Sequence, residues 1–153
     1  MLKLSKLGDY ATLLMTALAA EPERLHPAQQ LARRTHVSAP TVSKLLKLLT
    51  RAGLVDSIRG AQGGYRLARP PERITVADVV SALEGPFGLT ECSTHKGGCG
   101  IEQSCGVRAN WRLINHAIQS ALEAVTLAQM AAPMHRPPRE MPLIPMLRAA
   151  AGQ

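Results

Sequence analysis

Three cysteines close together are the residues of this sequence best suited to chemistry. Cys92, Cys99 and Cys105 are the only cysteines of the chain; glycines at positions 97, 98 and 100 lie among them, and Gly106 directly follows the last. Thiolates are soft ligands, and glycine lets a backbone turn closely around a compact centre where a Cβ would clash. Backbone N–H groups in such a loop can also hydrogen-bond the sulfurs and tune a redox potential. The spacing is compatible with an iron–sulfur cluster, with a zinc ion, or with thiols that hold no metal.

The excess positive charge of the chain is confined to its first half. The formal net charge is +7; residues 1–73 contain twelve basic and five acidic residues, whereas residues 74–153 are neutral. A local excess of this kind is typical of a module that contacts a polyanion such as DNA. An ordinary solvated basic surface is the alternative.

Composition and motifs argue against several other classes of protein. An apolar content of 46% is adequate for a core and argues against disorder. The odd cysteine count, with no apolar N-terminal leader, disfavours a secreted disulfide scaffold, and the apolar run at 13–20 is too short to span a bilayer. No pattern of nucleophile and base, paired carboxylates or phosphate-binding loop is present. We therefore expect a cytoplasmic protein that is not an enzyme, has no small-molecule substrate and does not enter a membrane.

The first half of the chain has the element order of a winged helix-turn-helix. Pro27 suits the first turn of a short helix, Ser38 is a good N-cap for the next, and Gly53 is a typical C-terminal stop. Glycines at 60 and 63 indicate a hairpin turn between two short strands. The predicted elements are helices over 2–20, 27–34 and 39–52, strands over 54–59 and 64–68, and a small helix over 75–83.

The last predicted element is a long helix from about Glu102 to Met130. Its apolar positions alternate in steps of three and four, at Trp111, Ile114, Ile118, Ala121, Val125 and Ala128. Such a heptad seam is narrower than the face that a helix normally buries in a globular core. We expect this helix to pair with a second copy and to make a homodimer; packing onto the N-terminal domain is the alternative.

These patterns predict a mainly α fold, a winged helix-turn-helix with a small β-hairpin wing and a long C-terminal dimerisation helix. The predicted parts are a DNA-binding domain at 1–84, a cysteine-rich loop at 85–107, the dimerisation helix at 108–130 and a proline-rich flexible tail at 131–153.

Several stretches of the chain form a recognisable set: Leu4–Ala11, Val37-Ser38, Leu48–Val55, Arg59–Leu67, Ile74–Leu83, the three cysteines and Trp111. Together they resemble the iron–sulfur-cluster-sensing winged-helix transcription regulators of the IscR and NsrR type. The resemblance covers roughly residues 1–130, and the opening stretch is most similar to the regulators of the SUF cluster-assembly operon. It implies a homodimer that binds double-stranded operator DNA and carries one iron–sulfur cluster per subunit. We favour a 2Fe-2S cluster over 4Fe-4S.

The fourth ligand of such a cluster is where the sequence departs from the family pattern. IscR-like members have a histidine three residues after the last cysteine, but this chain has Arg108, whose guanidinium has no lone pair to give. NsrR-like members use an acidic residue of the first helix from the partner subunit, and the matching residue is Asp9. His95 is the second candidate. A local hydrogen bond or salt bridge is the alternative role for Asp9.

The resemblance and the charge pattern together indicate which residues contact DNA. Phosphates are held by Lys and Arg, whereas sequence is read by side chains that reach base edges. Arg59 lies where a wing could insert it into a minor groove. The DNA-binding candidates are Ser38, Ala39, Pro40, Thr41, Ser43, Lys44, Lys47, Arg59 and Gly60, and His26, His36 and His116 are interpreted as surface or interface residues.

The sequence therefore predicts a homodimeric repressor, most similar to those of SUF-type operons, that senses iron–sulfur or redox status through a cluster bound by three cysteines. A zinc-stabilised or thiol-redox-sensing repressor without a cluster is the alternative.

Overall fold

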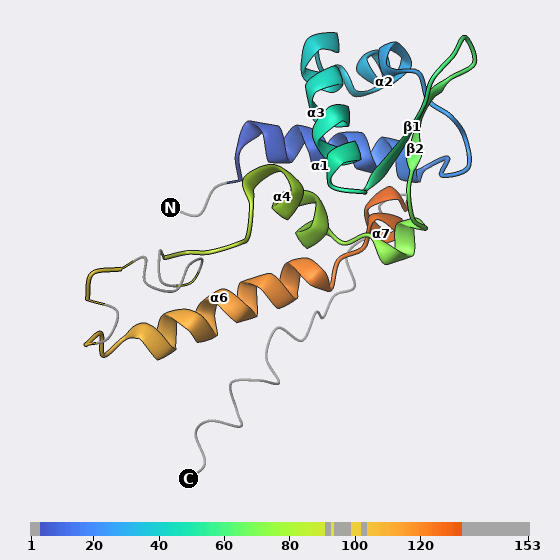
Figure 1. Ribbon diagram of the computed structural model, residues 1–153. Helices are drawn as coiled ribbons and strands as arrows, with labels where there is room; N and C mark the ends of the chain where they lie inside the picture. Colours follow the sequence, from blue (N-terminus) through green and yellow to red (C-terminus); the bar gives the residue numbers. More distant parts are fainter. Residues whose placement is uncertain (1–3, 91–92, 94–98, 102–103, 133–153) are drawn as a thin grey trace.

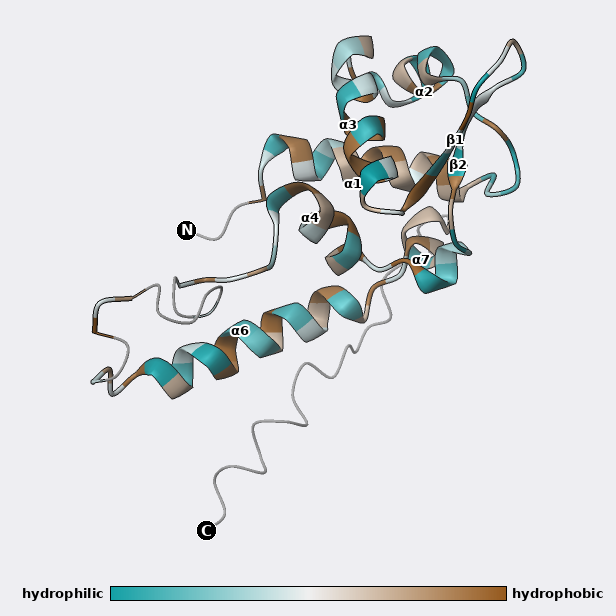
Figure 2. Cartoon of the chain, viewed as in Figure 1, coloured by the Kyte–Doolittle hydropathy of each residue, from teal (hydrophilic) through white to brown (hydrophobic). Residues whose placement is uncertain are grey.

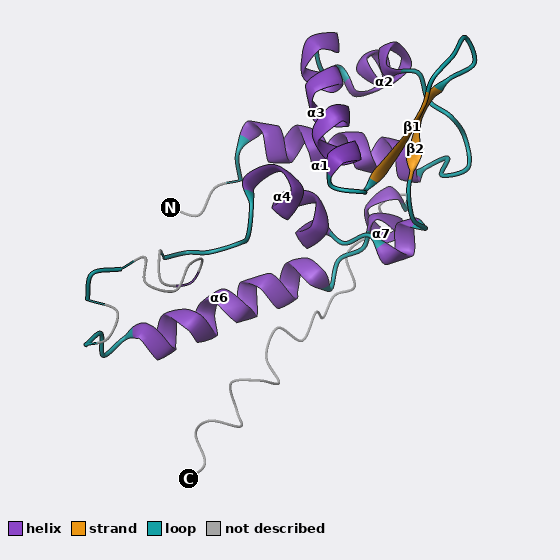
Figure 3. Cartoon of the chain, viewed as in Figure 1, coloured by secondary structure: helices purple, strands orange, loops and turns teal. Residues whose placement is uncertain are grey.

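The computed structural model describes residues 4–90, 93, 99–101 and 104–132 of the 153-residue chain (Figure 1). Its elements are α1 (Lys6–Ala19), α2 (Ala28–Thr35), α3 (Ala39–Arg51), β1 (Val55–Ile58), β2 (Gly64–Leu67), the 3-10 helix η1 (Pro71–Arg73), α4 (Val76–Glu84), α6 (Arg108–Glu123) and α7 (Leu127–Ala131). Helices dominate, and the strands form a single antiparallel hairpin among the described residues (Figure 3). The predicted mainly α winged helix-turn-helix is confirmed.

The hydrophobic core lies between α1 and the helices packed on it. Leu14 and Leu18 of α1, Leu31 of α2 and Leu45 of α3 are at most 1% exposed. All four apolar positions predicted on the inner face of α3, Val42, Leu45, Leu46 and Leu49, are fully buried. Helix α1 begins later than the apolar pattern predicts, because Ser5 is its N-cap and accepts a hydrogen bond from the Gly8 N–H at 3.1 Å.

The turn between α2 and α3 is tight because one residue adopts a left-handed conformation. His36, the C-cap of α2, has φ of 55°, a region that histidine enters more readily than β-branched residues do. Ser38 is the N-cap of α3, as predicted, but its hydroxyl pairs with the Thr41 hydroxyl at 2.8 Å and makes no capping bond to the backbone.

The hairpin is anchored to the core by the segment between α1 and α2. The backbone of His26 exchanges two hydrogen bonds of 2.9 Å with Tyr65 of β2. A Cβ at Gly64 would lie 2.9 Å from the His26 carbonyl carbon, so glycine permits this close approach. The interpretation of His26 as a surface or interface residue is wrong: its side chain is fully buried, in a segment that its backbone bridge fixes against the hairpin.

The predicted continuous helix from about Glu102 to Met130 is wrong in its start and in its continuity. Helix α6 begins at Arg108, and a break after Glu123 separates it from α7. Thr126 starts α7 with a capping box: its hydroxyl accepts from the Gln129 N–H and the Gln129 side chain accepts from the Thr126 N–H. A threonine cap followed by glutamine three residues later satisfies the free N–H groups of a new helix, which explains why the heptad pattern does not continue as one rod.

The break is held by a backbone bridge to the start of α4. The Val76 N–H donates to the Val125 carbonyl and the Leu127 N–H donates to the Ile74 carbonyl, both at 2.9 Å. Leu127 is consequently fully buried in the N-terminal core. Val125, expected on the dimerisation seam, lies outside α6, in the link that forms this bridge.

Helix α6 lies along α4, at the opposite end of the molecule from α2, α3 and the tip of the hairpin (Figure 1). In the described ranges, no helix combines the length and hydrophobicity that a membrane crossing requires.

Leu127→Ala tests whether α7 belongs to the core formed by the N-terminal helices. Loss of a fully buried leucine at this position is expected to lower the free energy of unfolding by about 2–5 kcal/mol. The control is Met130→Ala in the same helix, where the side chain is 41% exposed and a change within about 0.5 kcal/mol is expected. Urea unfolding of both variants measures this; equal, small effects would contradict the packing described here.

Candidate nucleic-acid interface and cysteine site

The outer face of α3 is polar and basic. Ser43, Lys44, Lys47 and Arg51 are exposed, opposite the buried leucines that hold the helix on the core. Ser38, Ala39 and Pro40 are exposed at its N-terminus, and Thr41 is half-buried. An exposed helix of this kind, second in a helix-turn-helix, is the element that enters a major groove.

The hairpin turn carries a further basic side chain and lies near the same end of the molecule as α3 (Figure 1). Arg59 and Gly60 are exposed beyond the end of β1, and Gly60 has φ of 120°, which disfavours other residues there. A Cβ at Gly63 would collide with the Ile58 carbonyl, so the tight turn also requires glycine at that position. The turn therefore presents the Arg59 side chain at the tip of the wing.

The basic residues of this surface differ in whether their charge is already paired. In the described part of the chain, Lys44, Lys47 and Arg59 make no ion pair. Arg66 of β2, by contrast, lies 3.8 Å from the Asp56 carboxylate across the hairpin. The charges of Lys44, Lys47 and Arg59 are therefore free of an acidic partner within the described residues, whereas that of Arg66 is not.

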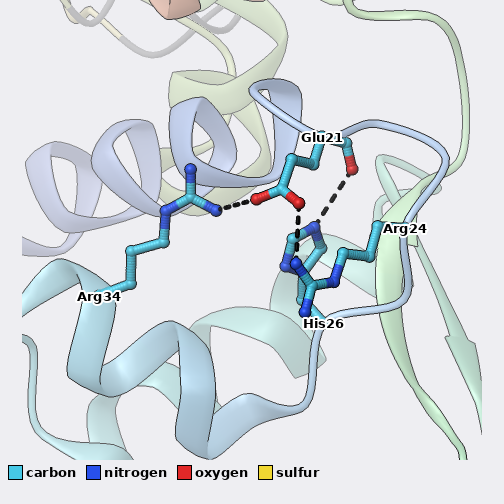
Figure 4. A network of polar contacts seen from close by, with 4 residues as sticks. All are labelled: Glu21, Arg24, His26 and Arg34. Atoms are coloured by element: carbon cyan, nitrogen blue, oxygen red, sulfur yellow. Dashed lines mark hydrogen bonds and ion pairs between the residues drawn. The ribbon is translucent and has the colours of Figure 1, made fainter.

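A network around Glu21, which the sequence patterns did not reveal, joins the turn after α1 to α2 and to the buried His26 (Figure 4). The Glu21 carboxylate accepts hydrogen bonds of 2.9 Å from both Arg24 and Arg34, and its backbone carbonyl lies 3.2 Å from the His26 Nε2. The Arg24 guanidinium, helped by Arg34, lowers the pKa of Glu21 below its ordinary value. Arg34 is therefore committed to holding α2 in place and contributes less free charge for phosphates.

The cysteine site is described only in part. Cys99 and Cys105 are free and half-buried, and the Cys105 carbonyl accepts a hydrogen bond from the Arg108 N–H at the first turn of α6. Cys92 and His95 lie outside the described residues. Among the residues that are described, no three His, Cys, Asp or Glu side chains gather closely enough to hold a metal ion. The donors fit a soft metal centre by their chemistry, because both described thiols are unbonded and lie among glycines.

Asp9 occupies the exposed side of the first turn of α1. No hydrogen bond or ion pair of its carboxylate is present within the described residues, so the expected alternative of a local salt bridge is not seen there. The start of α1 is fixed by Glu84 at the end of α4, whose Oε1 accepts from the Ser5 N–H at 3.1 Å. A Cβ at Gly8 would lie 2.5 Å from the same oxygen. Asp9 thus lies in the first turn of a helix whose start is hydrogen-bonded to Glu84. Glu84 is the last residue of α4, and the segment that contains the cysteines follows it in the sequence.

Helix α6 presents hydrophobic residues to solvent. Trp111 is 40% exposed and Ile114 is 42% exposed, although both are large and apolar. Figure 2 shows hydrophobic positions at intervals along α6 among hydrophilic ones. Of the other seam residues, Ala121 is exposed and Ile118 is half-buried. An exposed apolar stripe on a surface helix is typical of an interface.

Comparison with known proteins places this arrangement in a family. A model of the Rrf2 family, described as "Iron-dependent Transcriptional regulator", matches residues 4–133. The chain belongs to the Rrf2 family. Like the other members of this family, it is a DNA-binding transcriptional regulator and not an enzyme.

Three relatives illustrate how far the similarity of this Rrf2 regulator extends. Protein aau3 of Rhizobium meliloti is 37% identical over 127 residues, 82% of each chain. CymR, the global cysteine regulator of B. subtilis, has 32% identity and a TM-score of 0.70, over 88% of this chain and 100% of CymR. The IscR structure of T. potens has 34% identity and a TM-score of 0.64, over 88% of this chain and 93% of IscR.

Arg59→Ala tests the position of the wing in the DNA interface. The variant is expected to bind duplex DNA more weakly and to reduce the slope of log affinity against log salt by about one unit, because each neutralised phosphate contributes about 0.9. Arg112→Ala, on exposed α6, removes the same charge and is expected to leave the slope unchanged. Titrations at several salt concentrations measure both, and matching slopes for wild type and Arg59→Ala would rule out the assigned contact.

Proposed function

We propose that this Rrf2 regulator is a homodimeric repressor that senses iron–sulfur or redox status through a cluster bound by Cys92, Cys99 and Cys105. The observation that carries the proposal is the pair of free, half-buried thiols at Cys99 and Cys105, directly ahead of α6 in a transcriptional regulator. The similarity to IscR supports iron–sulfur chemistry at these residues. A 2Fe-2S cluster is the proposed form, and it would supply a centre whose presence depends on the iron and oxidant status of its surroundings.

The proposed dimer forms through the exposed stripe of α6. Trp111, Ile114 and Ala121 would pack against the same residues of a second copy, with Ile118 at the inner edge of the stripe. A two-fold dimer that reads the major groove needs its recognition helices about 34 Å apart, one helical turn of DNA. A small change in how α6 is held therefore changes both DNA contacts together.

The proposed fourth ligand is Asp9 of the partner subunit. Its carboxylate is exposed and unpaired within the described residues, as a ligand that must reach a second chain requires. An oxygen ligand at one iron makes a site that opens more readily than an all-thiolate site, which suits a sensor. Arg108 cannot serve, because a guanidinium has no lone pair for iron.

The proposed target is a SUF-type cluster-assembly operon, bound and repressed by the cluster-loaded dimer. The opening stretch Leu4–Ala11 supports this target through its resemblance to the SUF regulators. Loss of the cluster would loosen the dimer on its operator and allow transcription, so that cluster assembly rises when clusters are scarce.

Anaerobic purification tests the cluster directly. We expect a coloured protein that contains iron and sulfide and binds a SUF promoter duplex more tightly than the cluster-free protein does. Cys99→Ala and Cys105→Ala are each expected to abolish stable cluster binding and to leave the dimer intact. Colourless protein after enzymatic reconstitution, or equal promoter affinities with and without the cluster, would defeat the proposal; Mössbauer spectroscopy assigns the cluster type.

Asp9→Ala tests the ligand from the partner subunit. The variant is expected to assemble a cluster that decays at least about tenfold faster in air, since removal of even an outer-shell partner costs about that much. Glu72→Ala, which removes an exposed carboxylate from η1, is the matched control and is expected to decay like wild type. Decay is followed by visible absorbance, and indistinguishable rates for Asp9→Ala and wild type would exclude the carboxylate as a ligand.

A thiol-based switch is the second candidate, favoured by the similarity to CymR, a cysteine regulator. In that case the cysteine thiols would be oxidised directly, and the protein would hold no metal. Metal-free protein that forms disulfides on mild oxidation supports this function, whereas one zinc per subunit in colourless protein supports a purely structural site.

A further inference from the structure

Asn115 is the buried polar residue of α6 within the described structure, at 9% exposed. It faces the interior, whereas Trp111 and Ile114 of the same helix face solvent. Burial of an amide side chain costs free energy unless its donors and acceptors are hydrogen-bonded. The groups that hydrogen-bond the Asn115 side chain therefore explain why an amide, and not an apolar side chain such as leucine, occupies this buried position.

Both partners of Asn115 belong to the segment that leads from α4 to the cysteines. The side-chain Oδ1 accepts a hydrogen bond of 3.1 Å from the Leu89 N–H. The side-chain Nδ2 donates a longer bond of 3.5 Å to the Phe87 carbonyl. Neither Phe87 nor Leu89 lies in a helix or strand, so these bonds replace the pairing that regular structure would provide. The Asn115 side chain thus connects the irregular backbone at Phe87 and Leu89 to the middle of α6.

The tied segment continues at once into Thr90, which is hydrogen-bonded to Ser93. The Ser93 N–H donates to the Thr90 carbonyl at 2.9 Å, and the two hydroxyls pair at 2.8 Å. Position 92 lies between these residues in the sequence. Thr90 directly follows Leu89, so a shift of Thr90 must either move α6 or strain the bonds to Asn115.

We propose that Asn115 is a positioning residue that transmits the state of the cysteine site to α6. This inference rests on the proposed function, because it assumes that the cysteines hold a cluster. With the cluster present, the segment around Leu89 is fixed and Asn115 holds α6 in the orientation that suits DNA. When the cluster is lost, the segment loosens and the restraint on α6 weakens. Asn115 touches neither the cysteines described here nor the DNA-facing surface, so its effect is on the coupling between them.

Asn115→Leu and Asn115→Asp test this role against a purely structural one. Leucine fills a similar volume and removes both hydrogen bonds, whereas aspartate keeps an acceptor for the Leu89 N–H. Coupled sites commonly change affinity by about 5- to 150-fold. Asn115→Leu is expected to bind iron and sulfide and to keep the DNA affinity of cluster-free wild type, but to bring the ratio of cluster-bound to cluster-free affinity within about twofold of one. Asn115→Asp is expected to retain most of the wild-type ratio.

Gln119→Ala is the matched control. Gln119 lies one turn further along α6, is exposed, and pairs only with Glu123 in the described structure, so its loss is expected to leave the ratio unchanged. An unchanged ratio in Asn115→Leu, with only a lowered melting temperature, would reduce Asn115 to a structural residue and overturn the proposal.

Amide hydrogen exchange of the wild-type protein tests the same coupling and does not depend on the folding of any variant. The Leu89 amide is expected to exchange more slowly with the cluster bound than without it, while amides in α3 change little. Equal protection of Leu89 in the two states overturns the inference and leaves the proposed function intact. Failure of wild type to take up iron and sulfide at all is a failure of the proposed function itself, and the two failures are therefore distinguishable.

Discussion

Two backbone hydrogen bonds, between Val76 and Val125 and between Leu127 and Ile74, join the C-terminal part of the described structure to the rest of the fold. They bring the start of α4 and the start of α7 together. The chain therefore packs again on the N-terminal core, through α7, beside the point where α4 begins. The bridge therefore joins the two ends of the part of the chain that contains α4, the cysteines and α6. Because Ile74 and Leu127 are fully buried, the bridge is part of the core itself. Helix α6 is thereby held by the DNA-binding domain at one end and meets the cysteine segment at the other.

The polar surface that is proposed to meet DNA and the apolar surface that is proposed to meet a second copy lie at opposite ends of the molecule (Figure 1). No single residue can therefore serve both, and a signal at the cysteines must act through the elements that join them. The contacts of Glu84 with the start of α1 and of Asn115 with Leu89 are such elements. Both use hydrogen bonds from side chains to backbone, which are directional and are lost over small displacements.

Local patterns predicted the DNA-binding half well. The apolar spacing of α3, the cap positions and the glycines of the hairpin act over a few residues, and their outcome matches the structure closely. The long C-terminal helix was predicted less well, because its heptad spacing was read without the capping box at Thr126 and Gln129, a signal that was present in the sequence. His26 and Asn115 carry no local signal at all. Their burial follows from partners distant in sequence, Tyr65 and the segment 87–89.

The sequence by itself determined the element types, the polarity of their faces, the confinement of charge to the first half and the clustering of soft ligands near α6. These follow from interactions between neighbouring residues and from side-chain chemistry, which need no knowledge of the rest of the fold. Only the tertiary structure decided where the C-terminal helix breaks, that α7 completes the core, and which polar side chains are buried. Those outcomes depend on competition between distant segments for the same buried surface and for the same backbone hydrogen bonds, and periodicity along the chain does not record that competition.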